Sequence, residues 1–163
     1  MINKHKQKGA ETVEFAMIAL LFFAVLFAII EFSRALFVWN ALTEATRRGA
    51  RMAVICPYQS PIPKQVAIFD VISGSLGSSP IIGGLTPDMV SVRYLNQAGA
   101  VEANQALIKF AEVKITGYIH QLIIPLWGGS LTAPAFTTTL PSESLGSVPT
   151  YPGDPVSAPS CNF

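Results

Sequence analysis

Two glutamates at the start of a long apolar run are the residues of this sequence whose chemistry most needs explaining. Glu11 and Glu14 come directly before residues 15–30, sixteen residues without a polar side chain. Burying an unpaired carboxylate in a membrane costs several kcal/mol, so an acid on the first turns of an apolar helix requires a partner or a position among lipid headgroups.

The sequence does not show a set of side chains that could form a catalytic site. His5 lies in the basic leader, and His120 alternates onto the polar face of a predicted strand, where a lone histidine is an ordinary surface residue. The head therefore offers no histidine for a metal cluster or a nucleophile–base pair. The glycines and serines of residues 73–84 lack the Lys-Ser/Thr ending of a phosphate-binding loop. We expect no catalytic residue, metal, cofactor or small-molecule substrate.

The apolar run predicts a transmembrane helix. Sixteen helical residues span about 24 Å, and apolar residues up to Trp39 extend the segment toward the thickness of a bilayer. A buried helix of a soluble core is the alternative interpretation. Lys4, Lys6 and Lys8 place the N-terminus in the cytoplasm and the head outside, with membrane lipid as a partner. Without these lysines the net charge of +1 falls to −2, which argues against nucleic acid as a partner.

The residues that follow predict an α+β protein. The helix continues as a stalk over residues 11–55, because proline is absent there and Pro57 ends it. Its predicted packing stripe consists of Phe32, Leu36, Trp39, Leu42, Thr46, Gly49 and Ala53. Residues 61–73 predict a short helix, and residues 89–95, 111–121 and 131–140 predict strands of a three- to four-stranded antiparallel sheet with one wet face. The Pro- and Ser-rich residues 141–163 predict a poorly ordered tail unless Cys161 holds it.

The start of the helix resembles a type IV prepilin processing site. The order is Lys8, Gly9, Ala10, Glu11, Thr12, Val13, Glu14 and Phe15, followed by the apolar run. The resemblance implies cleavage between Gly9 and Ala10 by a prepilin peptidase, with Glu14 and Phe15 as the fifth and sixth mature residues. Glu14 then has two interpretations: it pairs with the α-amine freed at Ala10, or it reaches the cytoplasmic headgroups.

The rest of the helix is similar to the TadE-like pseudopilins of tight-adherence (Flp) pilus systems. Glu31, Phe32, Ser33 and Arg34 close the span, and the run Ala45-Thr46-Arg47-Arg48-Gly49-Ala50-Arg51 follows. The resemblance implies a non-enzymatic minor pilin-like protein that acts with other pilin-like subunits and a pilus assembly platform. It divides the chain into a leader (1–9), a transmembrane and stalk helix (10–55), a periplasmic head (56–140) and a tail (141–163). The alternatives are a type II secretion pseudopilin and a signal-anchored periplasmic enzyme or binding protein.

Two further hypotheses concern the stalk. Glu44 precedes Arg47 and Arg48 by three and four residues, so pairs within the helix would absorb both arginines. The alternative is that the arginines contact an acidic partner or lipid headgroups, and Arg51, which has no acid at either spacing, is the best candidate for this contact. Ala45, Gly49 and Ala53 lie four residues apart and line one groove, so with Arg51 they predict a helix–helix contact with another subunit.

The two cysteines predict a disulfide. Cys56 and Cys161 both fall in the part of the chain expected in an oxidising compartment. Two free thiols or a bridge between subunits are the alternatives.

Overall fold

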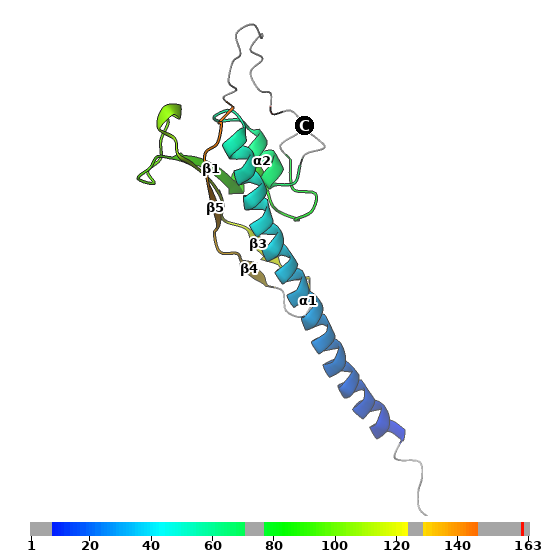
Figure 1. Cartoon of the computed structure of the whole chain (residues 1–163). Helices are drawn as coiled ribbons and strands as arrows, with labels where there is room; N and C mark the ends of the chain where they lie inside the picture. Colours follow the sequence, from blue (N-terminus) through cyan, green and yellow to red (C-terminus); the bar gives the residue numbers. More distant parts are fainter. Residues whose placement is uncertain (1–7, 71–76, 124–128, 147–160, 162–163) are drawn as a thin grey trace, which may run out of the picture.

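The computed structural model describes residues 8–70, 77–123, 129–146 and 161. Its main feature is the helix α1 (Lys8–Ile55), 48 residues and about 72 Å long. The helix begins three residues before the predicted stalk and ends at the predicted residue. The head packs mainly on its C-terminal half, while its N-terminal end projects away from the head (Figure 1). The predicted α+β architecture of a long helix with a small head is confirmed.

The second helix, α2 (Ile62–Ala67), is shorter than predicted. Pro63 lies in its first turn, as expected, but the helix closes early because Phe69 adopts a left-handed conformation with φ of 61°. The amide of Asp70 then donates to the carbonyl of Gln65 and that of Phe69 to Val66, which is the hydrogen-bond pattern of a Schellman cap. The last residues of the predicted helix, 71–73, lie outside the described residues.

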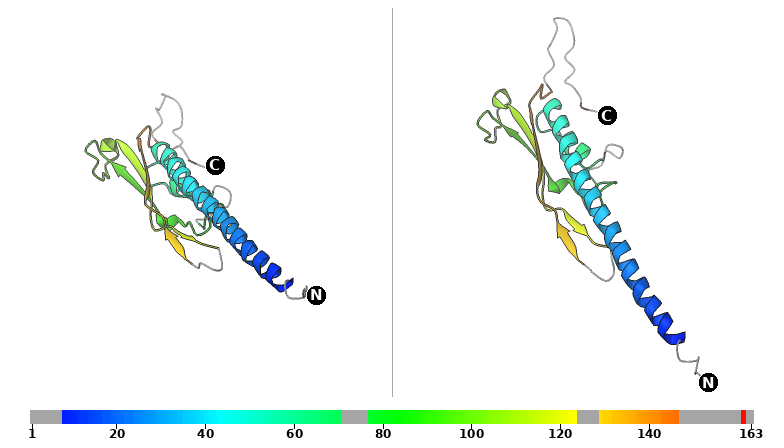
Figure 2. Two further views of the ribbon diagram at one scale, coloured as in Figure 1. Left: turned by 90° about the horizontal axis from the view of Figure 1, so that it is seen from below. Right: turned by 60° about the horizontal axis from the view of Figure 1, so that its bottom comes forward.

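The larger sheet is antiparallel, in the order β1-β2-β5, and packs against α1 (Figure 2). Its strands are β1 (Val90–Leu95), β2 (Phe110–Ile115) and β5 (Phe136–Pro141), with short 3-10 turns at Pro87–Met89 and Gln105–Leu107. On β2, Ala111, Val113 and Ile115 are buried against the helices, while Glu112 and Lys114 take the other face. The predicted sheet with one wet face is confirmed.

Two predicted strands are each broken in the structure. Residues 111–121 form β2 and β3 (Ile119–Gln121), separated by Gly117 with φ of 76°. Residues 131–140 form β5 and the end of β4 (Ser130–Thr132), separated around Pro134. Strands β3 and β4 pair antiparallel as a second, two-stranded sheet that follows α1 toward its exposed half (Figure 1).

The predicted packing stripe of the stalk holds only from Trp39 onward. Leu42, Thr46, Gly49 and Ala53 are buried against the head, and Trp39 is half-buried. Phe32 and Leu36 are exposed, in contrast to the prediction. The buried face of α1 instead continues through Val38, Ala35 and Glu31, because the head covers the helix along that line.

Candidate functional site

The predicted processing segment lies at the free end of α1. Gly9, Ala10, Glu14 and Phe15 are all exposed, and no described residue approaches within 4 Å of the position of a side chain on Gly9. The Thr12 hydroxyl donates to the Gly9 carbonyl at 3.1 Å, which is the carbonyl of the Gly9–Ala10 peptide bond. The residues on both sides of this bond are exposed, and its cleavage stays a prediction.

The apolar half of α1 has the character of a membrane span. It is long and apolar enough to cross a bilayer, and none of the residues in its most apolar window is buried by the rest of the protein. Side chains such as Phe15, Leu20 and Phe22 are 60–73% exposed. Exposing this much apolar surface to water is very unfavourable, so lipid or other helices must cover it.

The Ala45, Gly49 and Ala53 face is covered by the chain itself, which corrects the prediction that it contacts another subunit. A side-chain carbon on Gly49 would lie 2.9 Å from Ala67 Cβ, 3.1 Å from the Pro63 carbonyl oxygen and 3.2 Å from Val113 Cγ1. Gly49 therefore permits a close approach of the helix α2 of the same chain. Arg51 is exposed, and its contact with a partner stays a prediction.

Within the arginine cluster, Arg48 is bound by residues of the protein, whereas Arg47 is exposed. Arg48 Nε donates to Glu44 Oε1 at 2.9 Å, the i,i+4 pair expected from the sequence, and this hydrogen bond lowers the pKa of the Glu44 carboxyl. The guanidinium of Arg48 also lies 5.1 Å from the centre of the Phe69 ring, at the cap of α2.

A buried polar cluster joins α1 to the β3–β4 hairpin. His120 is only 1% exposed, with Nε2 3.3 Å from Glu31 Oε1 and its ring edge-on to Trp39. Arg34 Nε donates to Glu31 Oε1 at 3.1 Å, and its Nη2 donates to the Gln121 carbonyl. The Ile123 amide donates to Glu31 Oε2 at 3.2 Å. Glu31 thus binds groups from both elements.

The predicted surface position of His120 is wrong, for a geometric reason. An uninterrupted strand would keep His120 on the face of Glu112 and Lys114. The break at Gly117 shifts the alternation by one residue, so that Tyr118 and His120 face inward instead. Glu31 was expected near the membrane surface, and the sequence contains one clue to its pairing: an acid in an apolar helix requires a partner.

The predicted disulfide is confirmed. Cys56 and Cys161 are bonded, with their Cα atoms 5.7 Å apart, and neither cysteine is free. Cys56 is fully buried just after the end of α1. The bond therefore fixes position 161 beside the end of the stalk, while residues 147–160 of the predicted tail lie outside the described residues.

Metal-ligating side chains do not gather in the part of the chain that the structure describes. No group of three or more His, Cys, Asp or Glu side chains is placed there to hold a metal ion. Glu31 and His120 come together, but Arg34 occupies the remaining side of the carboxylate.

Comparison with known protein families gives a match on the helix α1. Residues 9–51 match a family model described as TadE-like protein, which confirms the resemblance drawn from the sequence. The match covers the processing segment, the apolar half of α1 and the arginine cluster. Searches of curated proteins and of solved structures found no match.

Proposed function

Because residues 9–51 are TadE-like, we propose that this protein is a minor pilin-like component, a pseudopilin, of a Tad/Flp-type pilus assembly or secretion apparatus. One observation carries the proposal: the segment that matches the TadE-like model includes an exposed apolar half-helix that begins at a prepilin-like processing motif. This half-helix anchors the protein in the inner membrane, and it is the surface that other pilin-like subunits and the assembly platform contact.

The proposed topology has the N-terminus in the cytoplasm and the head in the periplasm. Lys4, Lys6 and Lys8 before the span support this orientation by the positive-inside rule. The Cys56–Cys161 disulfide supports it independently, because such bonds persist in oxidising compartments such as the periplasm. The head has a structural role, and the protein is not an enzyme.

Processing by a prepilin peptidase creates the mature N-terminus in this proposal. Cleavage between Gly9 and Ala10 removes the three lysines and frees an α-amine on Ala10, whose unperturbed pKa of about 8 keeps it mostly cationic at neutral pH. Glu14 lies one helical turn further along the same helix. Its carboxylate is within reach of that amine in its own chain or in a neighbouring subunit.

N-terminal mass spectrometry of the membrane-bound protein tests the proposal. With an active prepilin peptidase the chain should begin at Ala10, and without it at Met1. Gly9→Leu should block cleavage and leave a protein about 1 kDa heavier, which is the share of the 17.5 kDa mass that residues 1–9 contribute. A wild-type chain that begins at Met1 beside an active peptidase would overturn the pseudopilin assignment.

A further inference from the structure

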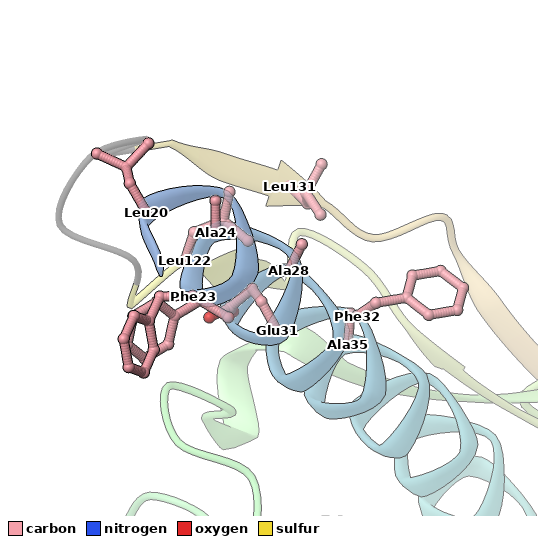
Figure 3. A pocket seen from close by; sticks show the side chains of 10 residues that line it. Leu20, Phe23, Ala24, Ala28, Glu31, Phe32, Ala35, Leu122 and Leu131 are labelled. Atoms are coloured by element: carbon pink, nitrogen blue, oxygen red, sulfur yellow. The ribbon is translucent and has the colours of Figure 1, made fainter. Parts of the chain in front are cut away.

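A groove of about 670 Å³ lies between α1 and the β3–β4 hairpin, which comprises the described residues 119–123 and 129–132. Figure 3 shows Leu122 and Leu131 of the hairpin beside Ala24 and Ala28 of the helix. Among the described residues that line it, Glu31 is the one that carries a charge. Small residues on the helix leave space under the hairpin, so the groove is open and apolar.

The residues of α1 that line this groove belong to the membrane span itself. A hydrocarbon core of about 30 Å takes about 20 helical residues. Any such window that contains the apolar residues 15–30 also contains Ala24 and Ala28. Since Leu122 and Leu131 line the same groove as these alanines, these two leucines lie at a depth that lipid chains occupy.

The amino-acid composition of the hairpin is compatible with a position among lipid chains. No Asp, Glu, Lys or Arg occurs between Lys114 and Glu143. Ile119, Ile123 and Leu131 are 52%, 70% and 46% exposed. Among the described residues, all but four of the exposed large hydrophobic side chains belong either to residues 13–37 of α1 or to this hairpin. The apolar surface is therefore continuous from the span onto the hairpin.

Three backbone groups of the hairpin at this level are hydrogen-bonded, as a position near a membrane interior requires. The carbonyl of Gln121 accepts from Arg34, the amide of Ile123 donates to Glu31, and the amide of Leu122 donates to the carbonyl of Gly129. The hairpin in turn covers Glu31, which is only 8% exposed. Because the hairpin covers the Glu31–Arg34 ion pair, the lipid-facing surface of α1 extends beyond this pair to Phe32, Leu36 and Phe37.

We propose that Leu122, Ile123 and Leu131 of the β3–β4 hairpin insert into the leaflet on the side of the head, with lipid acyl chains in the groove between the hairpin and α1. The head would then be held to the membrane at two places, by the span and by the hairpin. This inference rests on the proposed membrane anchoring of α1. It adds a second lipid-binding element that the helix alone does not imply.

Fluorescent labels at single introduced cysteines test the inference in the full chain. Both native cysteines are held in the disulfide, so an introduced thiol is the only one free to react. Labels at Ile123→Cys and Leu131→Cys probe the hairpin. Val101→Cys is a matched control, because Val101 is 68% exposed but lies on the loop after β1, and Phe22→Cys reports on the span.

The proteins are reconstituted into phosphatidylcholine–phosphatidylglycerol vesicles that carry nitroxide groups on their acyl chains. We expect the hairpin labels to show blue-shifted emission and quenching comparable with the label at position 22, while the label at 101 shows neither. If the hairpin labels show neither a blue shift nor quenching while the label at position 22 is quenched, the inference is overturned and the membrane anchor still stands. A blue shift without quenching would overturn it in favour of a protein partner, such as a helix of a second subunit. Loss of quenching at position 22 as well would contradict the anchor itself.

Discussion

At Gly49, the helix α1 approaches α2 and β2 too closely for a side chain. The three nearest atoms around a side-chain carbon there would lie at 2.9–3.2 Å, and two of them belong to α2. A glycine in the middle of a helix costs about 1 kcal/mol relative to alanine, and close packing outweighs this cost. The residue therefore determines how tightly the head packs on the stalk.

Gly49→Ala should destabilise the head. Overpacking costs about 1–3 kcal/mol and the gain in helix propensity is about 1 kcal/mol, so we expect a net loss of up to roughly 2 kcal/mol. The measurement is the denaturant midpoint of the detergent-solubilised protein, followed by near-UV circular dichroism. Gly83→Ala is the control, because no described atom lies within 4 Å of a side-chain carbon there. A Gly49→Ala midpoint at or above that of wild type would contradict the packing argument.

Because Tyr94 is buried, we expect the folded protein to lose stability at alkaline pH. The Tyr94 side chain is 6% exposed beside Tyr58, and burial raises the pKa of its phenol above the usual value of about 10. The folded state favours the neutral form, so this contribution is fully present below pH 10 and is lost as the pH rises through the raised pKa.

The denaturant midpoint measured from pH 8 to pH 11 should therefore fall at the alkaline end. Tyr94→Phe should make that fall shallower, and Tyr118 accounts for part of the remainder, since burial raises the pKa of its phenol as well. An unchanged alkaline profile in Tyr94→Phe would show that Tyr94 does not titrate in this way.

At the scale of elements, Glu31 links the hairpin to the helix. Its carboxylate binds Arg34, His120 and the amide of Ile123, so it fixes where the hairpin lies along α1. Glu44 is a matched comparison on the same helix, because it also pairs with an arginine but stays partly exposed and bonds only within α1. Exposed pairs of that kind contribute little to stability.

Glu31→Ala should release the hairpin, and Glu44→Ala should not. Hydrogen exchange measured by mass spectrometry should show faster exchange in peptides that cover residues 118–123 of Glu31→Ala, because the Ile123 amide loses its acceptor. Exchange in β1 and β2 should stay unchanged in both variants. Equal protection of the hairpin in wild type and Glu31→Ala would mean that the carboxylate does not hold it.

The disulfide connects the end of the stalk to a position 105 residues further along the chain. Closing a loop of that size contributes up to about 4–5 kcal/mol in the chain-entropy model. The non-reduced, denatured monomer should incorporate no alkylating reagent. Cys56→Ala and Cys161→Ala should each lower stability, and the double variant should lose no more than the larger single loss. Additive losses would show that packing of Cys56, and not the bond, is responsible.

At the scale of the whole molecule, the proposed processing makes Glu14 important only after cleavage. A cationic α-amine on Ala10 would begin a helix that sits in lipid or in a bundle of helices, where a charge without a partner is costly. Glu14→Ala should be cleaved normally but fail to support pili. Mass spectrometry follows the cleavage, and electron microscopy of complemented cells follows the pili. Glu11→Ala is the control, and normal pili in Glu14→Ala cells would rule out the pairing role.

The long helix, its end before Pro57, the one-sided sheet and the disulfide were all predictable from the sequence. Each depends on local or compositional physics: an unbroken apolar run, the conformational restriction before proline, alternation along a strand, and two cysteines in an oxidising compartment. The resemblance of residues 9–51 to TadE-like proteins was also visible in the sequence, because its motifs lie within one continuous segment.

Only the tertiary structure decided what lies against the helix. Small residues at Ala45, Gly49 and Ala53 indicate a close contact, but they do not indicate whether the partner is another subunit or the same chain. The break at Gly117 changed the face of His120, because a shift of one residue in a strand reverses every side chain after it. Glu31 and His120 are 89 positions apart, and such a pairing depends on how the hairpin folds back along α1.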